Sequence, residues 1–550
     1  MQDSILFWNA VALEANRVSH SDPGRMEQTG PPLSARALAI VHLAMYDAYA
    51  AITGGPDFPR YLAPPANVPT PPPPPPLLPD SSVRNAVAGA AHRTLTLLYK
   101  NQKDYFDAQL SGFNTADPYF VFGAEVGFAL WKFREADAGV GDNGYMPSNK
   151  RCRHRPDPDN PGQGFHAPFY GAQTKGFAIS ARHKLDAPPK CDSPGTEYLR
   201  ALKQVRAKGI MPELMATLPG ALFNDRRTPD ETLTGIFWGY DGANRLGTPP
   251  RLYNQIIRLI AMKRSPGAPN TPNSEGQNAR LFAFVNAAMA DAAILAWEAK
   301  YCYDLWRPVV AIREHDPSFG PGLATRPGNT ISDDADPSWL PLGAPNTNNT
   351  ALKNFTPPFP AYPSGHATFG AAAFHITRLF YGIAPGNKSR DDLFKDLSVV
   401  SEELNGINRD NRGTVRPRHV REFKDGLWQM ILENGISRVY LGVHWIFDAH
   451  AAKANGNPDL SKNVGGIPLG LTIAEDIFAQ NGKAPKLSTT TNPSVTPPAV
   501  TQPADAQGCA NTISPAQSVR KAKGKQEPEE PEETTTQEVH IPYLGGTSRR

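Results

Sequence analysis

The stretch ARLFAFVNAAMADAAILAWEAKYCYDLWRP, residues 279–308, carries apolar side chains at helical spacing and predicts one long helix over residues 279–307. Its most apolar part, residues 283–297, is interrupted by Asn286 and Asp291 and is shorter than the roughly 20 residues that cross a bilayer. We therefore expect no transmembrane helix in this chain.

Apolar spacing predicts further helices on both sides of this one. They cover residues 82–99, 119–136, 196–208, 229–240, 250–263, 366–381 and 420–439, and another runs to Ile52 after a cap at Ser34. Strand patterns are scarce, the proline run 71–76 predicts an extended connector, and residues 139–164 predict a long irregular connection. The fold class is therefore predicted to be all-α, with two packed helical bundles of the four-helix-bundle type.

Three parts follow from this pattern. Residues 1–190 form a predicted N-terminal helical bundle with the proline-rich connector and the long loop. Residues 191–484 form a predicted C-terminal helical bundle, and it carries all the candidate site residues. Residues 485–550 are rich in Pro, Thr and Glu and predict a disordered tail, which is either a solvated end or an interaction segment.

The composition of the 550 residues, 40% apolar and 20% charged, is ordinary for a soluble globular protein. A net charge of +3 gives no reason to expect a nucleic acid or an anionic membrane as partner. The amino terminus lacks a basic leader and a sustained apolar core, so no secretory signal is expected, and the compartment stays open between extracellular and cytoplasmic. The four cysteines, at 152, 191, 302 and 509, are too scattered for a disulfide framework or a zinc site and predict mostly free thiols.

Two cations near the end of the long helix are the first candidate site residues. Lys300 and Arg307 lie seven apart, so a continuous helix would project both from nearly the same face, and Pro308 would mark its end. Both could then reach one anion. The alternative is an ordinary pair of surface cations on an amphipathic helix.

The tetrapeptide Pro363-Ser364-Gly365-His366 predicts a turn into a helix whose first backbone N–H groups point outward. Such a turn is either a simple helix cap or an anion site, with Ser364 as a further donor and Gly365 allowing close approach.

Ser437-Arg438 and His444 form the third motif, and Gly442 between them permits a break that turns both side chains inward. A single histidine is more often a packed core residue than a ligand. Together, however, the three motifs predict a pocket for a tetrahedral oxyanion such as phosphate or vanadate, with arginine and lysine as donors and the histidines left for chemistry.

The order Lys-x6-Arg-Pro, PSGH, Ser-Arg-x5-His is similar to the signature shared by vanadium-dependent haloperoxidases and type 2 phosphatidic acid phosphatases. Outside it, the chain resembles the fungal-type vanadium chloroperoxidases over about residues 4–480. The stretches that carry this likeness are ILFWN at 5–9, GPPLSARA at 30–37, HAPFYG at 166–171, and YDG followed by GTPP within 240–250.

The resemblance implies a role for each motif residue. It implies vanadate as cofactor, with His444 as the only protein ligand of vanadium and a neutral imidazole. Hydrogen bonds to the vanadate oxygens are implied for Lys300, Arg307, Ser364, the Gly365 N–H and Arg438.

The resemblance also implies residues around the cofactor. His366 would face the vanadate opposite His444 and accept a proton, and Asp241 would hold Arg438. Trp297 and Phe359 match the halide pocket of the chloride-oxidising members, although either could be core packing.

The implied reaction is oxidation of chloride or bromide by hydrogen peroxide to hypohalous acid, which halogenates a small organic acceptor without haem or flavin. The alternative is an acid phosphatase that uses the same pocket with His444 as nucleophile. A non-catalytic oxyanion-binding scaffold would require loss of a pocket residue, and none is lost. Residues 448–465 depart from the fungal pattern. We expect a monomer.

Overall fold

The computed structural model describes residues 3–62, 80–137, 139–141, 145–191, 194–316 and 335–490. Helices dominate these residues, and the only strands among them form two short antiparallel pairs, β1 with β2 and β3 with β4. The predicted all-α class is therefore confirmed. The predictions for the proline run 71–76 and for the tail beyond residue 490 lie outside the described residues.

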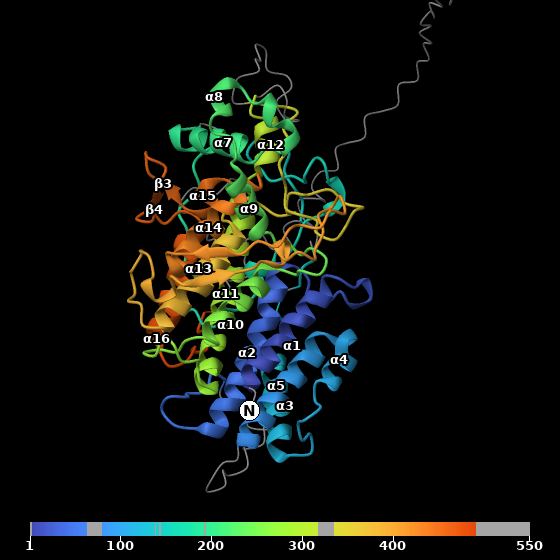
Figure 1. Ribbon diagram of the computed structural model, residues 1–550, viewed down its shortest axis with the longest axis vertical. Helices are drawn as coiled ribbons and strands as arrows, with labels where there is room; N and C mark the ends of the chain where they lie inside the picture. The colour runs from blue at the N-terminus through green and yellow to red at the C-terminus, as the bar shows by residue number, and fades with distance from the viewer. Residues whose placement is uncertain are drawn as a thin grey trace, which may run out of the picture.

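The N-terminal part of the chain forms a group of helices that packs mainly around α2 and α3 (Figure 1). Its members are α1 (Ser4–Ser19), α2 (Gly30–Thr53), α3 (Asp80–Leu98), α4 (Lys103–Ala108) and α5 (Pro118–Phe133). Thr29 caps α2, and Pro31 and Pro32 lie in its first turn. The predicted cap at Ser34 is therefore wrong, because proline fits the first turn, where its missing N–H costs nothing.

The second group surrounds the long helix α11 (Figure 1). Its helices are α9 (Pro229–Phe237), α10 (Pro249–Ala261), α11 (Glu275–Tyr303), α13 (Gly365–Phe380), α14 (Gly426–Tyr440) and α16 (Gly466–Gln480). Around them lie α6 (Tyr170–Gln173), α7 (Thr196–Lys208), α8 (Gly220–Phe223), α12 (Pro308–Arg313) and α15 (Ile446–Ala449). The strands are β1 (Leu397–Val399), β2 (Arg421–Phe423), β3 (Ala451–Ala452) and β4 (Pro458–Asp459). Part of the helix predicted at 420–439 is thus strand β2.

Helix α11 packs against α2 on one side and against α13 on the other, and so it joins the two groups. It is long and apolar enough to cross a membrane, but 94% of its apolar window is buried inside the protein. Its apolar surface is therefore used for packing against neighbouring helices. The boundaries at residues 190 and 484 stay a prediction.

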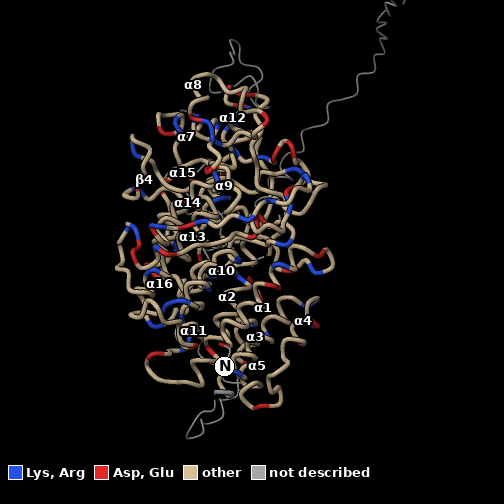
Figure 2. The backbone as a smooth tube through the Cα atoms, viewed as in Figure 1, with Lys and Arg blue, Asp and Glu red and all other residues tan. Residues whose placement is uncertain are grey.

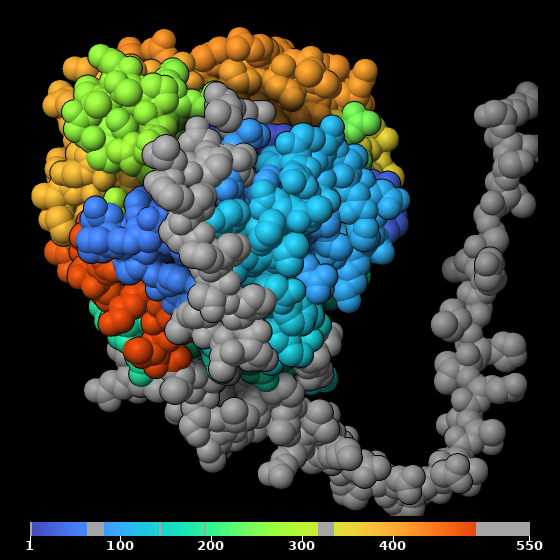
Figure 3. Space-filling view, turned by 90° about the horizontal axis from the view of Figure 1, so that it is seen from below, coloured from blue at the N-terminus to red at the C-terminus, as the bar shows by residue number. Residues whose placement is uncertain are grey.

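Seen from below, the N-terminal helices occupy one side of the molecule and the C-terminal segments the other (Figure 3). Lys and Arg positions are interspersed with Asp and Glu positions along the backbone (Figure 2). Cys152 and Cys191 form a disulfide, and no cysteine in the described part of the chain is free. The expectation of free thiols is wrong, because cysteines far apart in sequence are brought together by the fold.

Candidate active site

Arg307 reaches the site by a route that differs from the predicted one. Helix α11 ends at Tyr303, and Asp304 takes a left-handed conformation with φ 51° that stops it. Arg307 is extended, with φ −82° and ψ 156°, and forms the N-cap of α12 ahead of Pro308. Lys300 and Arg307 therefore do not share a helix face. A reversal of the chain, and not helical periodicity, brings them together.

Lys300 is fully buried near the end of α11. Its Nζ donates to the carbonyl oxygens of Pro360 (2.9 Å), Ala361 (3.0 Å) and Pro363 (2.5 Å). Burial, followed by repulsion from Arg307, holds the pKa of the Lys300 amine well below its usual value. Because all three hydrogens are donated to this turn, Lys300 fixes the backbone that leads into Ser364.

The guanidinium of Arg307 lies beside the imidazole of His444. Its Nε donates to the Phe359 carbonyl (2.8 Å), and its Nη1 contacts the Val443 carbonyl (2.7 Å) and the His444 Nε2 (2.9 Å). Burial lowers the Arg307 pKa to about 9. Its Nη2 is buried and has no hydrogen-bond partner among the described residues. That nitrogen is a donor free for a ligand.

His444 is oriented by a carboxylate that the sequence interpretation missed. Helix α14 ends at Tyr440, and Gly442 turns the chain with φ 74°. The His444 Nδ1 lies 2.7 Å from Asp448 Oδ2, which also accepts from the Trp445 N–H at 3.0 Å. The carboxylate fixes the proton on Nδ1, so Nε2 is the acceptor nitrogen of the ring, and in this structure it accepts from Arg307 Nη1. Burial, then the nearby cations, lowers the His444 pKa well below its usual value, so the imidazole is neutral.

Asp448 was within reach of sequence reasoning, because it lies only four residues after His444, although His444 precedes α15 and the two share no helix face. Its own pKa is raised to about 7 by burial, against the lowering effect of Lys300. Its backbone carbonyl accepts from the Ser364 N–H at 2.8 Å. Asp448 therefore links the histidine turn to the start of α13.

Ser364 caps α13, and its hydroxyl oxygen accepts from the Ala367 N–H. His366 lies in the first turn, with Nε2 at 3.0 Å from the Trp238 carbonyl and 2.9 Å from the Gly239 carbonyl. Two acceptors at Nε2 place the proton there, so Nδ1 is the nitrogen that can accept a proton. Burial, then the charge of Arg438, holds the His366 pKa well below its usual value.

Arg438 and Asp241 form a two-point ion pair, with Nη1 to Oδ2 at 2.9 Å and Nη2 to Oδ1 at 2.8 Å. The structure thus pairs the two residues as the resemblance implies. Burial raises the Asp241 pKa, and Arg438 opposes that shift. The Arg438 Nε is buried without a partner in the described chain. It is a second donor left for a ligand.

A very small cavity of about 10 Å³ lies against these groups. Its polar side is formed by Asp241, Gly365, His366, Arg438 and His444, and its apolar side by Pro31, Pro249, Trp297, Pro357, Phe359 and Phe369. The Trp297 and Phe359 ring centroids are 4.9 Å apart. Seven of the ten predicted site residues line this cavity. Lys300 and Arg307 contact the lining residues Phe359 and His444, and Ser364 directly precedes Gly365.

His166 supports the apolar side and was quoted in the sequence without a role. Its carbonyl accepts from Trp297 Nε1 (3.3 Å) and from the Tyr301 hydroxyl (2.7 Å). Its ring lies 6.5 Å from the Trp297 ring and 6.3 Å from the Phe359 ring, centroid to centroid. An N-terminal segment therefore buttresses the cavity wall.

The donor set fits an oxyanion. Over the described residues, no group of three or more His, Cys, Asp and Glu side chains could hold a bare metal ion. The two buried, unpaired donors on Arg307 and Arg438 need an acceptor, because an unmade hydrogen bond at a buried charged group is costly. A metal bound as an oxyanion, with one imidazole as its protein ligand, needs no cluster of metal-binding side chains and supplies acceptors for the two unpaired donors.

Sequence comparisons place the chain among known proteins. Residues 2–163 match the vanadium chloroperoxidase N-terminal domain, and residues 280–461 match the second helical-bundle domain of the same proteins. A vanadium chloroperoxidase of Curvularia inaequalis is 36% identical over 582 aligned residues, which cover 88% of this chain and 90% of that protein. The chain belongs to the vanadium chloroperoxidase family.

Solved structures agree with the fold of this vanadium chloroperoxidase family member. A bacterial vanadium-dependent iodoperoxidase superposes with a TM-score of 0.58 at 18% identity, covering 88% of this chain and 98% of that one. The holo form of a bacterial vanadium-dependent chloroperoxidase gives 0.54 at 16% identity, covering 84% and 94%. At these identities the likeness concerns the fold.

Proposed function

We propose that this family member is a vanadium-dependent haloperoxidase that uses hydrogen peroxide to oxidise chloride or bromide to hypohalous acid. The hypohalous acid then halogenates small organic acceptors. The observation that carries the proposal is the pair of buried, unpartnered donors on Arg307 and Arg438 beside Nε2 of His444, the acceptor nitrogen of that ring. This arrangement is built to receive an anion and to bond its central atom.

Each residue has a role that follows from its contacts. His444 would hold vanadium through Nε2, while Arg307 and Arg438 would donate to the vanadate oxygens. Lys300 adds positive charge and fixes the turn before Ser364 and Gly365. When bound, vanadate supplies a Lewis-acidic centre that activates peroxide without a change of oxidation state.

His366 would accept the peroxide proton at Nδ1, since its Nε2 already donates to two carbonyls. Trp297 and Phe359 give the cavity an apolar wall that strips water from a halide ion. The cations next to that wall compensate the cost of desolvating the halide.

A phosphatase reaction in the same pocket is the second candidate, and the His444–Asp448 contact favours it. The carboxylate increases the basicity of the imidazole, which suits a nucleophile toward phosphorus. Phosphate and vanadate share shape and charge.

One set of assays tests both. Apo-protein is incubated with orthovanadate, and peroxide-dependent halogenation of a diketone is followed with bromide and with chloride. We expect vanadate-dependent turnover, and phosphate should compete with vanadate during reconstitution. In His444→Ala the affinity for vanadate should fall by more than the roughly 100-fold that is lost when a residue supporting a metal ligand is removed. Phosphate ester hydrolysis without any halogenation would overturn the proposal in favour of the phosphatase.

We also infer a compartment that permits disulfides, because the Cys152–Cys191 bond would not persist in a reducing cytosol. A monomer and a small organic acceptor remain part of the same proposal. Size-exclusion chromatography with light scattering tests the first, and product analysis with a panel of acceptors tests the second.

A further inference from the structure

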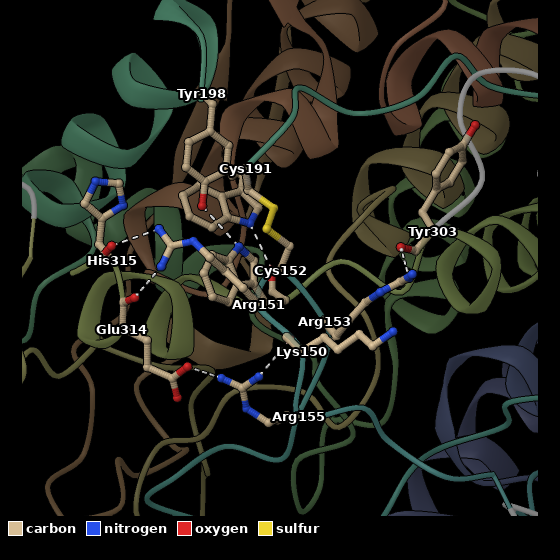
Figure 4. Close-up of a disulfide and its surroundings, with 12 residues drawn as sticks. Lys150, Arg151, Cys152, Arg153, Arg155, Cys191, Tyr198, Tyr303, Glu314 and His315 are labelled. Atoms are coloured by element: carbon tan, nitrogen blue, oxygen red, sulfur yellow. Dashed lines mark hydrogen bonds and ion pairs between the residues drawn. A yellow bond between two sulfur atoms is a disulfide. The ribbon is translucent and has the colours of Figure 1, made fainter. Parts of the chain in front are cut away.

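Residues 150–155, here called the Cys152 segment, lie beside Tyr303 at the end of α11 and beside Glu314 and His315 after α12 (Figure 4). The sequence KRCRHR contains four cationic residues and one half of the Cys152–Cys191 disulfide. No residue of this segment lines the cavity. Its contacts nevertheless converge on the connection from α11 to α12 and on the far end of α12.

The backbone of the Cys152 segment pairs with the residues just before Arg307. The His154 N–H donates to the Asp304 carbonyl at 2.9 Å, and the Trp306 N–H donates to the Cys152 carbonyl at 3.0 Å. Arg153 and Leu305 form the antiparallel bridge between these two bonds. The extended conformation that leads into Arg307 is thus held by a partner about 150 residues earlier in the chain.

Two arginines of the segment hold the far end of α12 (Figure 4). Arg151 donates to the carbonyls of Glu314 (2.9 Å) and His315 (2.8 Å). Arg155 pairs with the Glu314 carboxylate and donates to the Lys150 carbonyl at 3.2 Å. Helix α12 has only six residues. A helix this short has no stability of its own and depends on such contacts.

The disulfide connects the Cys152 segment to the residues that precede α7. Cys152 is bonded to Cys191, and Tyr198, near the start of α7, accepts from Trp306 Nε1 at 3.1 Å. The Arg151 guanidinium lies 5.4 Å from the Trp306 ring centroid. Trp306, the residue before Arg307, is therefore held at its backbone by Cys152 and at its indole by Tyr198.

Arg307 needs such support because its charge is buried. The side chain is 1% exposed and burial lowers its pKa, while Asp448 and Asp241 attract the charge and Arg438 repels it. Loss of hydration therefore opposes the buried position of the guanidinium whenever no anion is bound. His154 adds no charge, since burial and then Arg307 hold its pKa well below the usual value.

We propose that the Cys152 segment is the positioning element for Arg307. The Cys152–Cys191 disulfide, Arg151 and Arg155 hold the guanidinium in the place where it meets the anion, although none of them touches the anion. The proposal rests on the proposed function, because it assumes that the pocket binds vanadate. Removal of these contacts should lower the affinity for the oxyanion, although the residues that donate hydrogen bonds to it are all still present.

Binding by the apo-protein is the first test, with orthovanadate and inorganic phosphate as separate probes in titration calorimetry. Arg155→Gln and Cys152→Ser/Cys191→Ser should each raise the dissociation constant about tenfold, the lower end of what outer partners of a metal site contribute. Arg155→Lys should restore part of the affinity. Reduction of the wild-type disulfide should weaken phosphate binding in the same way.

Arg264→Gln is the matched control. Arg264 also pairs with one carboxylate, that of Asp396, and with one carbonyl, that of Leu393, and its side chain is 5% exposed against 10% for Arg155. It lies beyond the end of α10 and contacts no cavity residue. Its removal should lower the melting temperature comparably and leave the dissociation constants within about twofold, since only a local structural contact is lost.

A double-mutant cycle decides whether the effect passes through Arg307. In an Arg307→Gln background, the cysteine substitutions should cause no further loss of phosphate affinity, because the residue that they position is gone. The inference would be overturned if the losses of phosphate affinity in the cysteine and Arg307 variants were fully additive. It would also be overturned if Arg155→Gln and Cys152→Ser/Cys191→Ser bound phosphate as tightly as the wild type. Wild-type protein that binds neither probe would instead contradict the proposed function. If the double cysteine variant does not fold, Arg155→Gln completes the cycle.

Discussion

The two groups of helices use their buried charged side chains in different ways. In the N-terminal group, α1 to α5, the buried carboxylates are paired within the protein. Asp137 pairs with both Arg36 and Arg134 at 2.9 Å, and Asp47 accepts the N–H groups of Tyr61 (2.6 Å) and Leu62 (2.9 Å). These contacts tie segments together.

Around α11, α13 and α14, buried polar groups are instead left open toward one point. Arg307 and Arg438 each keep one unpaired nitrogen beside His444. The same helical architecture thus serves for packing in one group and for holding a strained set of cations in the other. Changes in the first should affect stability alone, and changes in the second should be coupled to oxyanion binding.

The largest effect is expected from Gly123→Ala in α5. A Cβ at this position would lie 1.9 Å from the Ala86 carbonyl oxygen in α3, so the two helices would have to separate. We expect a loss of more than about 3 kcal/mol in the free energy of unfolding, beyond the usual range for overpacking. Urea denaturation measures it.

Gly220→Ala in α8 is the control, because a Cβ there meets open space. It should change the free energy of unfolding by less than about 0.5 kcal/mol, as surface substitutions do. If Gly123→Ala were equally mild, close contact between α3 and α5 would not be what holds the N-terminal group together.

Next in size is Asp241→Asn, which leaves the buried Arg438 without its counter-charge. Removing one partner of a buried ion pair costs about 3 kcal/mol or more. Because a bound oxyanion can also supply a negative charge to Arg438, vanadate should reduce the difference in melting temperature between Asp241→Asn and the wild type. Thermal denaturation with and without orthovanadate measures this difference.

Asp137→Asn is the matched variant in the N-terminal group, since the exposure of the Asp137 side chain, 5%, is close to the 7% of Asp241. Asp137→Asn should also destabilise the protein, but vanadate should leave the difference in melting temperature between this variant and the wild type unchanged. Equal behaviour of the two variants would contradict the difference between the two groups.

Acid should weaken the N-terminal group through His42. This side chain is 1% exposed, its Nδ1 lies 2.6 Å from the Leu38 carbonyl, and its Nε2 contacts the Asn9 amide at 2.8 Å. Burial lowers its pKa from 6.5 to about 4. The pKa of His42 is therefore lower in the folded protein than in the unfolded chain. The stability that depends on neutral His42 is fully present above pH 6.5 and is lost as the pH falls toward 4.

The loss amounts to about 3 kcal/mol, since each pKa unit corresponds to about 1.4 kcal/mol. His42→Gln should flatten the pH dependence of the free energy of unfolding by that amount between pH 7 and pH 4. Urea denaturation at several pH values tests it. An unchanged slope would show that protonated His42 is tolerated in the folded protein.

Local pattern predicted most of the helices, while the three motifs and the family resemblance together named residues that the fold brings to one cavity. The helix predicted at 196–208 is α7, residue for residue, because its apolar spacing and ends are local features. The relation of Lys300 to Arg307 was wrong for a nonlocal reason. The Cys152 segment pairs with residues 304–306 and stops helical geometry there. A pairing across 150 residues leaves no periodic signal at either segment.

The disulfide was missed for the same reason, since two cysteines 39 residues apart carry no local sign of contact. Asp448 is different. Its spacing from His444 was visible in the sequence, but an acid four residues after a histidine is common on helices. Only the direction of the His444 ring, set by Gly442, makes that spacing meaningful.

The smallest effect is expected from Phe359→Ala at the apolar wall. The Phe359 ring lies 5.1 Å from Lys300 Nζ and 5.0 Å from the Arg307 guanidinium carbon. Without the ring, water reaches both cations and the halide keeps more of its hydration. Chloride is the more strongly hydrated and less easily oxidised ion, so its kcat/KM should fall about tenfold, or about 1.4 kcal/mol, and that of bromide should fall less.

Phe106→Ala in α4 is the corresponding change in the N-terminal group, where the ring is fully buried away from the cavity. It should lower the free energy of unfolding and leave the ratio of kcat/KM for chloride and bromide unchanged. If Phe359→Ala also left that ratio unchanged, Phe359 would be core packing, as its alternative interpretation holds. The halide would then be selected by the cations alone, and the apolar wall would serve only to keep Arg307 and Lys300 in a low dielectric.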